Sequence, residues 1–116
     1  MPDLNLLVIK TSQLAEHAAF YAKLGFHFQF DYHRHGTGPY HYASINGNIV
    51  LEIYPLPKGI TVADNTTRLG FKIADLDNLI KELPEENILT APASTAWGYT
   101  AIIQDPDGRK IELVQP

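Results

Sequence analysis

The segment Val50-Leu51-Glu52-Ile53 has a counterpart at Lys110-Ile111-Glu112-Leu113, and this pair of segments decides the predicted fold. In each segment a glutamate stands next to apolar residues, and the two glutamates are sixty residues apart. Successive side chains of a β-strand point to opposite faces of a sheet, so each segment predicts a strand with one apolar and one mixed face. We expect the apolar face to pack on a helix, and the mixed face, with Glu52 and Glu112, to line a ligand cleft.

The repeat extends toward the N-terminal side of both segments. Leu7 to Leu14 and Leu69 to Leu76 each run from a first strand to the start of a helix, with an offset of sixty-two residues. Hydrophobic periodicity then predicts the order β-α-β-β-β in each half. The predicted fold class is α+β: a single domain, 1–116, that contains two βαβββ modules with curved mixed sheets. The modules span residues 4–54 and 68–115 and are joined by a linker at 55–67.

Turn and cap residues mark the ends of the predicted elements. Thr11-Ser12 is expected to cap the first helix and Gly25 to end it, whereas Asp75 is expected to cap the second helix. The stretch 92–96 is typical of a loop, and Asp105-Pro106-Asp107-Gly108 predicts a tight turn. The expected strands are 4–10, 26–33, 40–45, 49–54, 68–74, 88–91, 99–104 and 110–114, and the expected helices are 13–24 and 76–83.

Composition excludes several classes of function. The chain has 116 residues, no cysteine, and nine basic against thirteen acidic side chains, which gives a net charge of −4. The lack of cysteine excludes disulfides, thiolate metal sites and a cysteine nucleophile. The acidic balance argues against nucleic acid as a partner and favours neutral or cationic ligands. Without a long apolar run or a signal-peptide pattern, the sequence predicts a cytoplasmic protein that does not enter membranes.

Histidines are concentrated around one predicted turn. His33 and His41 flank it and His35 lies within it, and the purely structural interpretation is that they belong to a solvated hairpin tip. The alternative is a surface metal site formed by the three imidazoles. His17, on the first predicted helix, is expected to be partly exposed.

Several motifs together resemble a known family. They are Ala19–Phe26 (AFYAKLGF), Val50-Leu51-Glu52, Trp97-Gly98, and the turn at 105–108 that leads into Ile111-Glu112-Leu113. With these motifs the chain resembles the vicinal oxygen chelate superfamily, which includes glyoxalase, extradiol dioxygenases and bleomycin resistance proteins. The similarity is greatest to the bleomycin-resistance-like branch. That resemblance implies a homodimer with two clefts, which sequester a cationic drug and so confer antibiotic resistance.

The resemblance also bears on metal binding. Metal-dependent members of the family carry one ligand near the start of each module's first strand and one in its last strand. Carried over to this chain, the last-strand positions are Glu52 and Glu112, whereas the first-strand positions are Leu6 and Arg68. Leucine and arginine cannot ligate a cation. The resemblance therefore implies no metal or other cofactor; the alternative is a divalent Zn, Ni, Mn or Fe ion held by Glu52 and Glu112.

The predicted ligand-binding residues are Glu52, Tyr54, Arg68, Trp97 and Glu112, and no residue is predicted to be catalytic. Arg68 has two alternatives, a partner for the glutamates or a ligand clamp. Trp97 has three: a cleft wall, a core residue or a dimer contact. The leading hypothesis is a metal-independent protein that binds an aromatic or cationic drug-like molecule in a cleft, within one chain or across a homodimer. The alternatives are a metal-dependent lyase, isomerase or dioxygenase, and an inert structural subunit.

Overall fold

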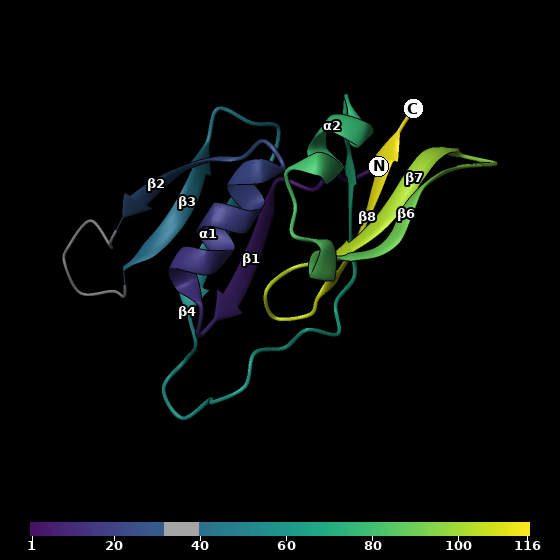
Figure 1. Cartoon of the computed structure of the whole chain (residues 1–116). Helices are drawn as coiled ribbons and strands as arrows, with labels where there is room; N and C mark the ends of the chain where they lie inside the picture. The colour runs from purple at the N-terminus through teal and green to yellow at the C-terminus, as the bar shows by residue number, and fades with distance from the viewer. Residues whose placement is uncertain (32–39) are drawn as a thin grey trace. The chain divides into compact units, whose positions relative to one another are not determined.

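A computed structural model of the chain describes residues 1–31 and 40–116 (Figure 1). It consists of two compact units, Met1–Asp64 and Asn65–Pro116, each with its own four-stranded sheet. The division falls inside the segment predicted as a linker, 55–67. Both units have the order β-α-β-β-β, so the predicted α+β fold with two modules is confirmed. Among the described residues, no helix is long and apolar enough to cross a membrane.

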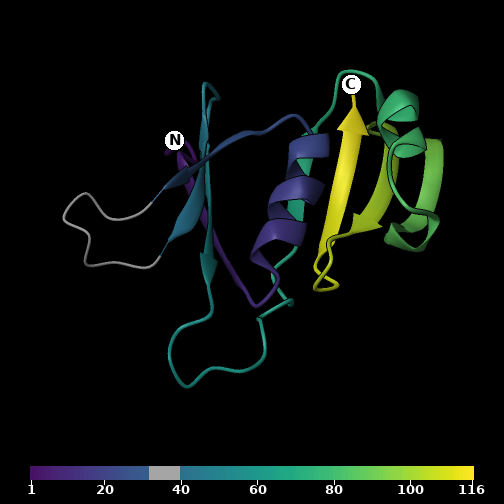
Figure 2. The ribbon, with the colours of Figure 1, turned by 60° about the vertical axis from the view of Figure 1, so that its left-hand side comes forward.

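The first unit is a mixed sheet with one helix. Its strands are arranged in the order β1-β4-β3-β2. β1 and β4 are parallel, whereas β4, β3 and β2 are antiparallel neighbours. Figure 2 shows this sheet nearly edge-on, with α1 on one side of it. The elements are β1 (Leu6–Thr11), α1 (Leu14–Lys23), β2 (His27–Asp31), β3 (His41–Ile45) and β4 (Val50–Pro55).

The helix-facing side of this sheet forms the core of the first unit. Leu51 and Ile53 of β4 are fully buried, as is Tyr21 of α1. Gly25 ends the helix as predicted: it has φ +114°, a conformation that favours glycine. The predicted cap at residues 11–12 is wrong, because the N-cap residue is Gln13. Thr11 still belongs to β1, where its hydroxyl accepts a hydrogen bond of 2.9 Å from the Gln13 backbone N–H.

His17 of α1 is fully buried, so the expectation of partial exposure is wrong. Its Nδ1 lies 3.0 Å from the Gln13 carbonyl oxygen and 3.3 Å from the Thr11 hydroxyl. Its ring also stacks on Tyr21, with 6.2 Å between the ring centroids. The helix packs on the sheet and turns this position inward, and the polar neighbours at the start of the helix contact the Nδ1 atom of the imidazole.

The second unit repeats the topology, with strand order β5-β8-β7-β6. Its helix is capped as predicted, because the Asp75 carboxylate accepts a hydrogen bond of 3.2 Å from the Asn78 backbone N–H. In Figure 2 this helix, drawn in green, lies beside the strands of its own sheet. The elements are β5 (Leu69–Lys72), α2 (Leu76–Lys81), a 3-10 helix (Glu85–Asn87), β6 (Ile88–Thr95), β7 (Gly98–Gln104) and β8 (Lys110–Gln115).

β6 is longer than the sequence predicts. The stretch 92–96 was expected to form a loop, but β6 continues to Thr95 and pairs with β7. Pro92 is tolerated because β6 is the edge strand and because the register shifts between Thr90 and Ala93. A proline has no backbone N–H to donate, so edges and irregular positions are where a strand accepts one.

The predicted turn at residues 105–108 is confirmed, and it encloses a buried ion pair. Gly108, at φ +85°, donates a backbone hydrogen bond of 2.9 Å to the Asp105 carbonyl. The Asp105 carboxylate accepts hydrogen bonds from the backbone N–H groups of Asp107 and Arg109. It also pairs with the Arg109 guanidinium, and both side chains are almost fully buried. This motif therefore stabilises the turn between β7 and β8.

Candidate functional site

The open face of the first sheet, opposite α1, brings together an imidazole, a carboxylate and a phenol. The Nε2 atom of His41 lies 3.5 Å from the Oε2 atom of Glu52. The His41 ring stacks on the Tyr54 ring, with 4.2 Å between centroids and 6° between planes. His41 is 6% exposed, whereas the Glu52 side chain is 23% exposed. Glu52 and Tyr54 thus share a face, as strand parity predicts, and His41 contacts both.

The register of β3 and β4 explains this cluster. Ala43 pairs with Glu52, and paired residues of antiparallel strands lie on the same face. His41 is two residues before Ala43 and therefore has the same orientation. The interpretation of His41 as part of a solvated hairpin tip is wrong, because its ring is buried between β-strand neighbours. His33 and His35, the other members of the suggested surface metal site, lie outside the described residues.

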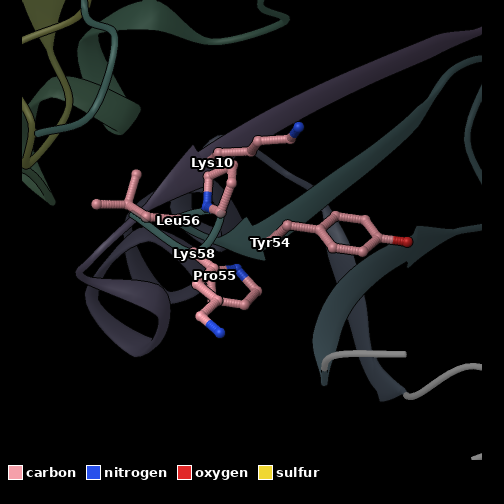
Figure 3. A pocket seen from close by; sticks show the side chains of 6 residues that line it. Lys10, Tyr54, Pro55, Leu56 and Lys58 are labelled. Carbon is pink, nitrogen blue, oxygen red and sulfur yellow. The ribbon is translucent and has the colours of Figure 1, made fainter. Parts of the chain in front are cut away.

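A pocket of about 310 Å³ lies at the end of β1 and β4, next to this cluster. Lys10 and Tyr54, which are paired in the register of the two parallel strands, contribute side chains to it. In Figure 3 these two side chains extend toward the same side, whereas Leu56 points the other way. The lining residues are Lys10, Tyr54, Pro55, Leu56, Pro57 and Lys58. Sequence reasoning named only Tyr54 among them.

The other three predicted ligand-binding residues belong to the second unit. Glu112, on β8, is partly buried and pairs with Gly70 of β5 and Ile102 of β7. Arg68 is exposed and directly precedes β5. Within the described residues, no ion pair of 4 Å or less joins Arg68 to Glu112. Trp97 lies in the turn between β6 and β7 and is 67% exposed, which contradicts its interpretation as a core residue.

Each unit has one glutamate on the last strand of its sheet that could contribute to a metal site. Glu52 pairs with Val8 of the neighbouring strand β1, and Glu112 pairs with Gly70 of the neighbouring strand β5. Neither neighbour can ligate, and His41 is the one imidazole placed against Glu52 in the described part of the chain. No cluster of three or more histidine, aspartate or glutamate side chains suited to a metal ion occurs among the described residues. A catalytic ion bound by protein side chains usually has three or more protein ligands, and neither unit brings that many together within its described residues.

Tyr99, on β7, makes a contact that sequence reasoning did not anticipate. Its hydroxyl donates a hydrogen bond of 2.7 Å to the Asp77 carboxylate at the start of α2. This hydrogen bond, followed by burial and by the negative charge of Asp77, raises the pKa of Tyr99 above its ordinary value of 10.0. The phenol stays protonated at neutral pH, and the contact ties α2 to the sheet.

Comparisons with known proteins agree with this architecture. The chain is 27% identical over 116 residues to an uncharacterized protein of Mycolicibacterium smegmatis, a match that covers 98% of this chain and 94% of that one. Many solved structures have similar folds, and two of them serve as examples. The first is TnmS3, an antibiotic binding protein from Streptomyces sp. CB03234, with a TM-score of 0.74, 23% identity, and coverage of 100% of this chain and 97% of that chain.

The second structure is the bleomycin resistance determinant encoded on the transposon Tn5, with a TM-score of 0.64 and 22% identity. That match covers 98% of each chain. Identities this low establish the fold only. The family model of the Glyoxalase/Bleomycin resistance protein/Dioxygenase superfamily, however, matches residues 3–113, which is nearly the whole sequence. The chain therefore belongs to the Glyoxalase/Bleomycin resistance protein/Dioxygenase superfamily.

Proposed function

We propose that this protein binds and sequesters a small aromatic or cationic molecule without a metal ion. The observation that carries the proposal is the environment of Glu52. Its carboxylate contacts the His41 imidazole, and the residue paired with Glu52 on β1 is the apolar Val8. Few side chains near this carboxylate could ligate a metal ion together with it. The Glu52 side chain is nevertheless partly exposed and can contact a ligand.

The proposed contacts are Glu52 and Tyr54 in the first unit and Arg68, Trp97 and Glu112 in the second. Each is at least partly accessible, which a ligand contact requires. Tyr54 offers an aromatic surface and Glu52 a charge for a ligand. A homodimer and a cytoplasmic location are also part of the proposal, and both rest on the sequence alone.

The similar folds guide the choice of ligands to test. TnmS3 is described as an antibiotic binding protein, and the Tn5 protein as a bleomycin resistance determinant. We therefore propose antibiotics with aromatic systems as the first ligand class, and antibiotic resistance as the cellular consequence of sequestration.

The test is calorimetric titration of the purified protein with a panel of bleomycin-type and aromatic antibiotics. We expect Glu52→Gln to weaken binding about tenfold, because a hydrogen bond to a charged group is lost. Glu16→Gln on the exposed side of α1 is the matched control and should bind as the parent protein does. A panel without any binding, or a divalent metal present at one equivalent and lost in Glu52→Gln, would overturn the proposal and favour the enzyme.

A further inference from the structure

The pocket at the end of β1 and β4 is cationic, although the protein as a whole is acidic. Two of its six lining residues are lysines and none is acidic. Neither Lys10 nor Lys58 makes an ion pair within the described part of the chain. On the same face, the Glu52 carboxylate contacts His41. Both ammonium groups are therefore available to a ligand.

Lys58 is positioned by a tight turn rather than by a loose loop. The Ile60 backbone N–H donates a hydrogen bond of 3.0 Å to the Pro57 carbonyl, which closes a turn over residues 57–60. Gly59 has φ +86° at the third position of this turn, as a type II turn requires. Pro57 has a fixed φ as well. The wall that carries Lys58 is thus formed before a ligand arrives, which lowers the cost of ordering it on binding.

The opposite wall is equally constrained. Tyr54 is held on one side by the stacked ring of His41, and Lys10 is its partner in the parallel register. Figure 3 shows the Tyr54 ring and the Lys10 side chain extending side by side from the ends of the two strands. A planar group placed here would meet Tyr54 and two prolines, and it would be flanked by Lys10 and Lys58, whose side chains point to different sides in Figure 3.

We propose that this pocket binds a planar aromatic anion, with the ring against Tyr54 and the prolines and the anionic group near Lys10 and Lys58. The inference rests on the proposed function, and it narrows the ligand from aromatic or cationic to aromatic and anionic. The volume of about 310 Å³ is at the lower end of the range for small-molecule pockets, so it suits a small ring system.

The net charge of −4 does not oppose this assignment. Exposed charges farther away than about 8 Å are largely screened at physiological ionic strength. The charged residues that line the pocket are the two lysines, and the Glu52 carboxylate on the same face contacts His41. A consequence is that the affinity should fall as salt is added, because these ammonium groups are themselves exposed.

The experiment compares three naphthalenes that share a ring and differ in charge: 2-naphthoate, 2-naphthamide and 2-naphthamidine. Each is titrated by calorimetry into the full-length protein at low and at physiological salt. We expect 2-naphthoate to bind about tenfold more tightly than the neutral amide and the cationic amidine. Lys10→Gln and Lys58→Gln should each weaken naphthoate binding about three- to tenfold and leave amide binding unchanged.

The control variant is Lys23→Gln, which removes an exposed lysine from α1 of the same unit and should bind as the parent does. The inference would be overturned if the amidine bound as tightly as naphthoate or more tightly. It would also be overturned if neither Lys10→Gln nor Lys58→Gln changed the affinity for naphthoate. Both results would leave the proposed function intact. Absence of binding by all three naphthalenes would also overturn the inference. The antibiotic titrations then decide separately whether the proposed function stands.

Discussion

Replacing Asp105 with asparagine should destabilise the protein far more than a surface substitution would. The Asp105 residue is 2% exposed and the Arg109 residue is 4% exposed, so both charges are withdrawn from water. Asparagine has nearly the same shape and keeps an oxygen that can accept from the backbone N–H groups of Asp107 and Arg109. What it removes is the negative charge of Asp105, so that Arg109 stays buried with one nearby charge fewer.

The expected loss is about 3–5 kcal/mol of unfolding free energy, the typical result of removing one partner of a buried ion pair. That is a large share of the roughly 5–15 kcal/mol that stabilises an ordinary domain. Arg109→Met added to Asp105→Asn should recover part of the loss, because the buried positive charge is then removed as well. The assay is urea unfolding of the single variants and the double variant, followed by far-ultraviolet circular dichroism.

The comparison variant is Asp75→Ala, which removes an exposed helix cap and should cost only about 0.5–2 kcal/mol. If Asp105→Asn lost less than about 1 kcal/mol, or if the double variant were less stable than both single variants, the ion pair would not stabilise this turn. Ligand affinity is expected to be unchanged, since the pair is placed between β7 and β8 to hold a turn and not to contact ligand.

Three further predictions concern the rest of the fold. Gly98→Ala should lose about 1–3 kcal/mol of unfolding free energy, because Gly98 has φ +131° and a Cβ there would lie 3.0 Å from a backbone oxygen of β8. In the control Gly47→Ala, where φ is not positive, the unfolding free energy should hardly change. Asp77→Asn should lower the pKa of Tyr99 toward its ordinary value. In the parent protein the raised pKa stabilises the fold below pH 10, and this stabilisation is lost as the pH rises through the raised pKa; the variant should lack it. Ultraviolet titration of both proteins measures the pKa of Tyr99, and an unchanged pKa in the variant would contradict the prediction. Leu51→Ala should cost about 2–5 kcal/mol in urea unfolding, and a loss below about 1 kcal/mol would mean that the site is not core.

Much of the fold could be predicted because the two halves repeat one pattern. The alternation around Glu52 and Glu112 correctly separates the helix-facing side of each sheet from the open side. The ends of the elements were less predictable. The eight-residue length of β6 depends on a tertiary neighbour, the strand β7 with which it pairs. The start of α1 at Gln13 depends on local geometry, because β1 continues to Thr11, whose hydroxyl accepts from the Gln13 backbone N–H.

Sequence reasoning placed His41 beside a hairpin turn and missed its contacts with Glu52 and Tyr54, although a signal for them was present. The connection between β3 and β4 has four residues, which places Tyr42 opposite Ile53 and Ala43 opposite Glu52. A two-residue turn at Asn46-Gly47 would have paired other residues of β3 and β4, but the same side chains of β3 would share a face with Glu52. In both cases the side chain of His41 lies on the face of Glu52, so counting back from the turn would have found it.

The cationic pocket, by contrast, could not have been predicted from composition. Net charge sums over the whole surface, whereas a ligand responds to the charges within about one Debye length of its site. Lys10 and Lys58 are far apart in the sequence, and what brings them to one pocket is the parallel register of β1 with β4 and the turn closed at Ile60. An acidic chain can therefore present a basic pocket. The sign of the ligand's charge has to be read from the lining residues, which favour an anion here.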